Sequence, residues 1–130
     1  MKEKYLQDFK NAGLRLRRLA TSMSFSEFKL NSDGMLTVVV QDAENDQVLM
    51  VAYMDEEAYN ITVESGIMTY YSRSRQEIWI KGLTSGHFQQ VESLTVDCDK
   101  DTLLARVFQT GAACHTGNRT CFFTEIAELK

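Results

Sequence analysis

The hydrophobic residues of the N-terminal twenty positions recur at the spacing of one helix face. They follow each other at intervals of four or three positions: Tyr5, Phe9, Ala12, Leu16 and Leu19. This periodicity predicts a helix over residues 1–20. Arg15, Arg17 and Arg18 would then crowd its last turn, where cations suit the helix dipole. A solvated helix end explains these arginines better than a functional patch does.

From residue 22 onward the pattern changes to short apolar runs between polar turns. Residues 22–32 form a mostly polar stretch that includes Phe25 and Phe28, and they predict a loop or a short strand. The β-branched run 35–40 and the apolar run 48–54 flank a polar turn, which predicts a hairpin. Later runs predict five more strands, at residues 67–71, 76–80, 87–97, 103–108 and 121–127.

A second helix is expected between these strands. Asp55 can cap its first turn, in which Glu56 and Glu57 suit the dipole, and Gly66 can end it in a left-handed conformation. Two helices among mostly antiparallel strands predict the α+β class. No repeat, linker or low-complexity segment divides the chain, so residues 1–130 are interpreted as one domain.

Composition and charge exclude several classes of protein. Hydrophobic residues make up 44% and charged residues 25% of 130 positions, which is typical of folded globular chains. The longest apolar run, residues 48–54, is too short to cross a bilayer. A net charge of −4 disfavours a general nucleic-acid binder. No signal-peptide pattern opens the chain, which predicts a cytoplasmic protein with reduced thiols.

The three cysteines, Cys98, Cys114 and Cys121, cannot all pair within one chain. Thiolates favour zinc, and three protein ligands leave the open position that catalytic zinc sites keep for water, whose pKa such zinc lowers to about 7. The alternative is that all three are small buried side chains. His115 could be a fourth ligand, or a general acid or base beside the metal.

A run of alternating aspartates, Asp97, Asp99 and Asp101, is the second chemical feature. In an extended segment these side chains would share one side, and their converging carboxylates would suit Mg²⁺. A solvated acidic turn is the simpler alternative for this pattern alone.

Several motifs together resemble the phosphoribosyl-AMP cyclohydrolase family. They occur in the family's order at residues 40–42, 50–54, 71–75, 79–82, 84–86, 97–101, 109–117 and 121–122. Residues 35–123 are therefore interpreted as the core that carries these motifs, and residues 1–34 as an N-terminal extension. The chain departs from the family at Ala112, where proline is frequent, and at Leu83, where an acidic residue is common.

The resemblance implies hydrolytic opening of the adenine ring of phosphoribosyl-AMP, by adding water at C6 and breaking the N1–C6 bond, in histidine biosynthesis. It also implies an intertwined homodimer with zinc at the subunit interface. Cys98 would come from one subunit, and Cys114 and Cys121 from the other. The three aspartates match the family's magnesium ligands.

The same reading assigns expected roles to polar residues in the turns. His115 is the candidate that protonates the leaving ring nitrogen. Candidate substrate contacts are Ser72, Arg73, Ser74, Arg75, Trp79, Lys81, Thr84, Ser85 and Thr116. Trp79 could stack on the base or simply belong to the core. Mg²⁺ could neutralise phosphate charge or be structural.

Two alternatives remain open at this point. One is a non-catalytic zinc module that scaffolds a partner, which would require a closed site of three cysteines plus His115. The other is single-stranded nucleic-acid binding through Arg73, Arg75 and Lys81, which the net negative charge disfavours.

Overall fold

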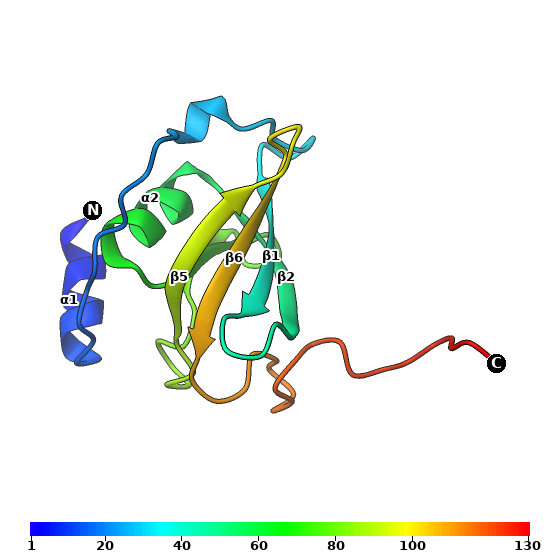
Figure 1. Cartoon of the computed structure of the whole chain (residues 1–130). Helices are drawn as coiled ribbons and strands as arrows, with labels where there is room; N and C mark the ends of the chain where they lie inside the picture. Colours follow the sequence, from blue (N-terminus) through cyan, green and yellow to red (C-terminus); the bar gives the residue numbers. More distant parts are fainter.

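The chain folds around a four-stranded sheet that carries two helices on one side (Figure 1). The computed structural model describes residues 1–130. In chain order the elements are α1 (Glu3–Asn11), η1 (Phe25–Glu27), β1 (Leu36–Asp42), β2 (Val48–Met54), α2 (Glu56–Ser65), β3 (Thr69–Ser72), β4 (Glu77–Ile80), β5 (Gln89–Val96) and β6 (Thr102–Gln109). Neither helix has the length and apolar character that a bilayer-spanning helix needs.

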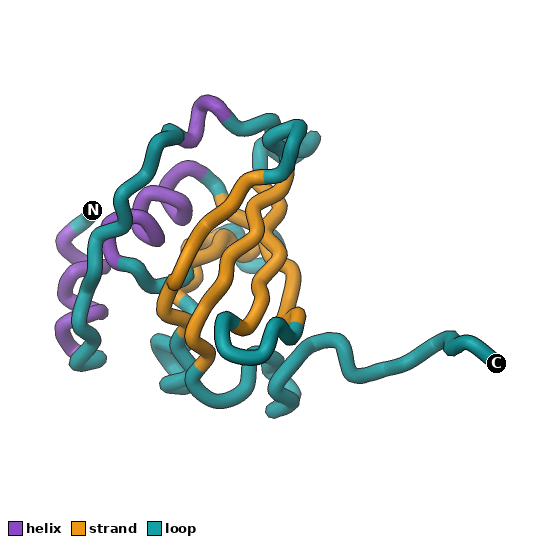
Figure 2. The backbone as a smooth tube through the Cα atoms, viewed as in Figure 1, coloured by secondary structure: helices purple, strands orange, loops and turns teal.

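The strand order of the main sheet is β2-β1-β6-β5 (Figure 2). The β1–β2 and β5–β6 pairs are antiparallel, and β1 lies parallel to β6. β3 and β4 form a separate antiparallel pair. These pairings confirm the α+β class, the mostly antiparallel strands and the predicted hairpin over residues 35–54.

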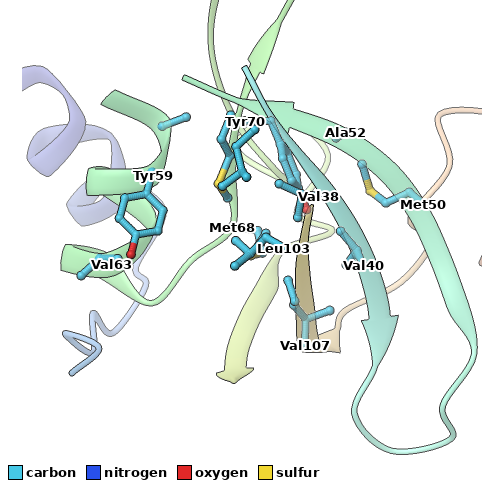
Figure 3. Packing of buried hydrophobic residues seen from close by; sticks show 14 of the residues in the cluster. Val38, Val40, Met50, Ala52, Tyr59, Val63, Met68, Tyr70, Leu103 and Val107 are labelled. Carbon is cyan, nitrogen blue, oxygen red and sulfur yellow. The ribbon is translucent and has the colours of Figure 1, made fainter. Parts of the chain in front are cut away.

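The core lies between the main sheet and α2 (Figure 3). Alternate residues of β1 are buried, among them Val38 and Val40, because successive side chains of a strand point to opposite faces. Leu103 on β6 continues this layer, and Tyr59 and Val63 cover it from α2. The two ends of the sheet are left free for turns and loops.

The ends of α2 confirm the predicted capping. The Asp55 carboxylate accepts a hydrogen bond from the Ala58 N–H at 2.8 Å. Gly66 ends the helix at φ 75°, a left-handed conformation that glycine adopts without strain. Both signals are local, which explains why the sequence predicts them well.

The predicted helix over residues 1–20 is wrong beyond Asn11. Gly13 takes φ 70°, which turns the chain out of the helix. The following segment runs alongside α2, with the Arg17 N–H donating to the Ser65 carbonyl at 2.9 Å and the Leu19 N–H to the Val63 carbonyl at 2.7 Å. The apolar side chains of this segment reach the core by tertiary packing, not by helical periodicity.

The predicted strand over residues 121–127 is also absent. This segment finds no neighbouring strand within the chain, and it extends away from the body (Figure 1). Its large apolar side chains are exposed, namely Phe122, Phe123 and Ile126. Residues 22–32 contain the short helix η1, where a loop or short strand was predicted.

Candidate functional site

A cysteine lies beyond each end of β6. Cys98 stands in the turn that precedes this strand, and Cys114 in the loop that follows it. Eight residues rising about 3.3 Å each separate the strand's two ends by about 26 Å. The thiols of Cys114 and Cys121, by contrast, lie close enough for each to shift the pKa of the other. One chain therefore brings two of the three predicted zinc ligands together and holds the third far away.

Backbone hydrogen bonds fold the loop of Cys114 and Cys121 into a compact turn. The Cys114 N–H donates to the Asn118 carbonyl at 3.1 Å, and the Gly117 N–H donates to the Cys114 carbonyl at 3.1 Å. The Thr116 hydroxyl donates to Cys114 Sγ at 3.1 Å. These contacts fix the direction of the Cys114 thiol before any metal is bound. We call residues 110–121 the cysteine loop.

Long-range contacts anchor the cysteine loop to the first hairpin. The Cys121 N–H donates to the Leu49 carbonyl at 2.8 Å. Arg119 forms an ion pair with Asp42, whose side chain is buried at 1% exposure. Burial alone would raise the pKa of Asp42, but the amide of Glu44 and the Arg119 guanidinium outweigh it and hold this pKa below its usual value.

Lys81 is a cation whose charge acts on both thiols. It is only 6% exposed, and its ammonium lies 5.6 Å from the centre of the Trp79 ring. Burial lowers the pKa of Lys81, while the charges of Cys121 and Cys114 oppose that shift. Because thiolates are the form that binds metal, a cation held here favours the ligating state of both cysteines.

Hydrogen bonding and burial shift the pKa values of the two thiols in opposite directions. The hydroxyl and then the backbone N–H of Thr116 lower the pKa of Cys114, and Lys81 adds to this effect. Burial, followed by the neighbouring Cys114, raises the pKa of Cys121. Cys114 is therefore the first thiolate of the pair. Two adjacent thiol donors form a soft ligand set that fits zinc.

Other predicted residues lie around this end of the sheet. His115 is exposed next to Cys114. Thr84 and Ser85 occupy an exposed turn between β4 and β5, where Ser85 Oγ accepts a hydrogen bond from the His87 N–H at 3.1 Å. Trp79 is half-buried with its ring 5.4 Å from that of Tyr70, a position at the edge of the core.

The three aspartates meet at the opposite end of β6, as predicted, but in a tight turn and not an extended segment. One carboxylate oxygen from each residue lies within 4.8 Å of those from the other two. Asp97 accepts hydrogen bonds from the N–H groups of Asp101 and Thr102 at 3.0 and 3.2 Å, and Lys100 turns the chain at φ 62°. This turn, residues 97–101, is called the aspartate turn. A cluster of three oxygen ligands fits a hard divalent cation.

Arg73 and Arg75 lie near the aspartate turn, far from the cysteine loop. The Arg73 guanidinium sits 4.1 Å from the centre of the Tyr53 ring and 3.8 Å from Asp33. The segment of Asp33 is tied to the aspartate turn, because the Lys29 N–H donates to the Lys100 carbonyl at 2.7 Å. Ser72 and Ser74 belong to the same β3–β4 turn. The predicted substrate residues are thus divided between the two ends of the sheet.

Three residues of the site lie outside the motif-based prediction. Asp42 and Arg119 anchor the cysteine loop, and the His87 ring packs against Gly111, where a Cβ would lie 2.5 Å from His87 Cδ2. Asp42 and Arg119 stand 77 positions apart, so no local pattern connects them. The only signal that the sequence offers is their opposite charge, with Asp42 inside the motif at residues 40–42 and Arg119 between the motifs at 109–117 and 121–122.

Comparison with known proteins places these features in a family. A model of the family phosphoribosyl-AMP cyclohydrolase matches residues 50–123, which include all three cysteines and the aspartate turn. The chain belongs to this family. Its members are hydrolases, and the chain is an enzyme of that class. The first 49 residues lie outside the matched region.

Curated relatives agree with this assignment over most of their length. The phosphoribosyl-AMP cyclohydrolase of Salinibacter ruber is 58% identical over 96 residues, covering 74% of this chain and 76% of the relative. That of Streptococcus mutans is 60% identical over 93 residues, covering 72% and 85%. That of Streptococcus thermophilus is 56% identical over 104 residues, covering 78% and 93%.

Proposed function

We propose that this chain forms a cytoplasmic homodimer that opens the adenine ring of phosphoribosyl-AMP in histidine biosynthesis. Water adds at C6 and the N1–C6 bond breaks. The observation that carries the dimer is the separation of Cys98 from Cys114 and Cys121 by the length of β6. No single chain can close a three-thiolate site across that distance, whereas a second copy can supply the missing ligand.

The shared zinc site would join the aspartate turn of one protomer to the cysteine loop of its partner. Cys98 is exposed and free to reach another molecule, and Cys114 and Cys121 are already adjacent. Three protein ligands leave one coordination position open. When bound there, zinc supplies a Lewis acid that activates water for attack at neutral pH. Lys81 offsets part of the negative charge of the thiolates.

The chain's own residues supply the remaining proton transfers and orientation. His115, exposed beside Cys114, would protonate the ring nitrogen N1 as the bond to C6 breaks. Thr116 holds the Cys114 thiolate in place through its hydroxyl. Thr84 and Ser85 would offer short donors to the substrate, with Trp79 closing the base side of the pocket.

Substrate phosphates would be held where the two ends meet. Arg73 and Arg75 lie at the aspartate end and carry guanidinium groups that fit phosphate oxygens, with Ser72 and Ser74 beside them. Mg²⁺ held by Asp97, Asp99 and Asp101 would neutralise phosphate charge at the same place. In this arrangement a complete pocket draws its cations from both protomers.

Mixing two inactive variants tests the shared site directly. Cys98→Ala and Cys114→Ala each remove a ligand from a different half of the site, so each homodimer should be inactive. After unfolding and refolding together, half of the dimers should be mixed, and each should keep one intact site out of two. Activity should therefore recover to about one quarter of that of the unchanged protein. Ring opening is followed by ultraviolet absorbance.

A matched control separates complementation from simple refolding. Cys114→Ala mixed with Cys121→Ala should recover nothing, because both lesions fall in the same half of the site. Failure of the first mixture to recover activity, with zinc present and mixed dimers confirmed by native mass spectrometry, would exclude the shared site. Zinc bound without any turnover in the unchanged protein would favour the scaffold alternative.

A further inference from the structure

A small cavity lies outside both ends of the sheet, beside the segment that follows α1. It encloses about 240 Å³ between this segment, the end of α2 and the start of β5. Its lining includes Arg15, Arg17, Ser65, Gln90 and Phe108, and it contains no acidic residue. The cavity is therefore positively charged in a chain whose net charge is −4.

The backbone that carries the two arginines is fixed in place. The Arg17 N–H donates to the Ser65 carbonyl at 2.9 Å. Gly66 permits this close approach, because a Cβ there would lie 2.4 Å from the Arg17 carbonyl oxygen. Arg15 and Arg17 stand two positions apart and line the same cavity. Both side chains are exposed, and because the backbone that carries them is already held, less ordering is needed when they bind a ligand.

Four arginines of the chain form ion pairs with carboxylates, but the two arginines that line the cavity do not. The carboxylate pairs are Arg73 with Asp33, Arg75 with Glu77, Arg106 with Asp46, and Arg119 with Asp42. Arg15, Arg17 and Arg18 form no ion pair, although the chain has 18 acidic residues against 14 basic ones. Two unpaired guanidiniums that line one acid-free cavity form a site for an anion that the chain itself does not supply.

We propose that this cavity binds a phosphate group through Arg15 and Arg17. Arginine forks match phosphate oxygens in a bidentate geometry. Phe108, which is 43% exposed, offers an aromatic face beside the cations for a planar group attached to the phosphate. The volume is below that of a typical pocket for a drug-sized ligand, about 300–1,000 Å³, so the cavity itself suits the phosphate group, and the rest of a nucleotide would lie outside it.

Nuclear magnetic resonance on the full chain tests the proposal without turnover. The probes are inorganic phosphate and adenosine 5′-monophosphate, each titrated at constant ionic strength into ¹⁵N-labelled protein. We expect shifts concentrated at the amides of Arg17, Gly66 and Gln90. Arg17→Gln should weaken phosphate binding about tenfold, since a lost charge-assisted contact carries a factor of that order. The backbone hydrogen bond to Ser65 survives this substitution, so the fold should persist.

Arg18→Gln is the matched control, because Arg18 is an exposed, unpaired neighbour that does not line the cavity. It removes the same charge and should change phosphate binding less than about twofold, because a charge outside the cavity lining acts on the bound anion only through salt-screened solvent. Equal weakening by both variants, or shifts spread over the whole surface, would overturn the proposal.

The kinetic behaviour of Arg17→Gln then identifies the source of the phosphate. A raised KM with unchanged kcat would assign the site to a substrate phosphate, because only ground-state binding is lost. Unchanged kinetics together with weakened binding of inorganic phosphate would assign it to a separate phosphate ligand. Both results presuppose the binding seen by resonance, and the binding test itself does not depend on the proposed reaction.

Discussion

The two ends of β6 each carry a cysteine, but they hold it in opposite ways. At the aspartate turn Cys98 is exposed, and the turn is closed by hydrogen bonds within a few residues of one another. At the cysteine loop Cys114 is buried, and the loop is tied to the first hairpin by contacts across 70 or more positions. One end is a short turn with acidic side chains, and the other is an anchored loop with two thiols and a buried lysine nearby.

This difference fits two halves of one site with separate tasks. The cysteine loop needs rigidity, because two thiols must be held at ligand spacing before a metal binds. In the proposed dimer the aspartate turn needs exposure, because its cysteine would have to reach the other protomer. Long-range side-chain anchors therefore belong at the first end, whereas the second is held by its own turn and by one backbone hydrogen bond from Lys29. Substitutions at the two ends should differ accordingly.

The largest difference in the free energy of unfolding is expected between substitutions of the arginines at the two ends. Arg119→Ala leaves the buried Asp42 carboxylate without its partner and should lower the free energy of unfolding by about 2–3 kcal/mol. Arg75→Ala removes an exposed pair with Glu77 near the aspartate turn and should cost less than about 1 kcal/mol. Urea unfolding of metal-free protein measures both.

Zinc competition with a chelator adds a second readout for the anchor. Arg119→Ala should weaken zinc binding, because the cysteine loop loses its link to β1, while Arg75→Ala should leave zinc affinity unchanged. Equal losses of unfolding free energy in Arg119→Ala and Arg75→Ala would show that the cysteine loop is not more strongly anchored than the aspartate end.

The sequence predicts the local half far better than the anchored one. The convergence of the aspartates and the caps of α2 depend on residues within a few positions of each other. The Arg119–Asp42 pair joins residues 77 positions apart and becomes visible only when β1 and the cysteine loop are placed side by side. The wrong prediction for residues 12–20 has the same origin: Leu16 and Leu19 are half-buried through contacts beyond their own segment.

Acid should remove the stability that the ionised Asp42 carboxylate contributes through its pair with Arg119. The pKa of this carboxyl is lowered in the folded chain, so its contribution to stability is complete above its unfolded value of about 3.9 and is lost as pH falls through the folded value. The stability difference between the unchanged protein and Asp42→Asn should be largest above about pH 4 and shrink below it. Urea titrations at several pH values measure this. A difference that stays constant down to the lowest pH would show that Asp42 is not held ionised.

A smaller effect is expected within the cysteine loop itself. Thr116→Val keeps the side-chain shape but removes the hydroxyl that donates to Cys114 Sγ, so the pKa of Cys114 should rise. In metal-free protein the alkylation of Cys114 at neutral pH should slow, as measured by site-resolved mass spectrometry across a pH series. Cys98, at the other end of β6, is the internal reference in each sample, and Thr124→Val in the tail is the matched control. An unchanged Cys114 profile would contradict the assigned hydrogen bond.

The smallest effect is expected at the aspartate turn, where the direction of the change in melting temperature is informative. Asp99 adds negative charge to the cluster, whereas Asp97 closes the turn by accepting two backbone hydrogen bonds. Without divalent cations Asp99→Asn should raise the melting temperature slightly, because the carboxylates repel one another less. The unchanged protein should gain stability with added Mg²⁺ by mass action, and the variant should gain less. Thermal unfolding with and without Mg²⁺ measures both effects, with Asp8→Asn on α1 as the control for lost surface charge. A variant that melts lower without Mg²⁺, or that keeps the full Mg²⁺ response, would show that the three carboxylates do not act together as a cation site.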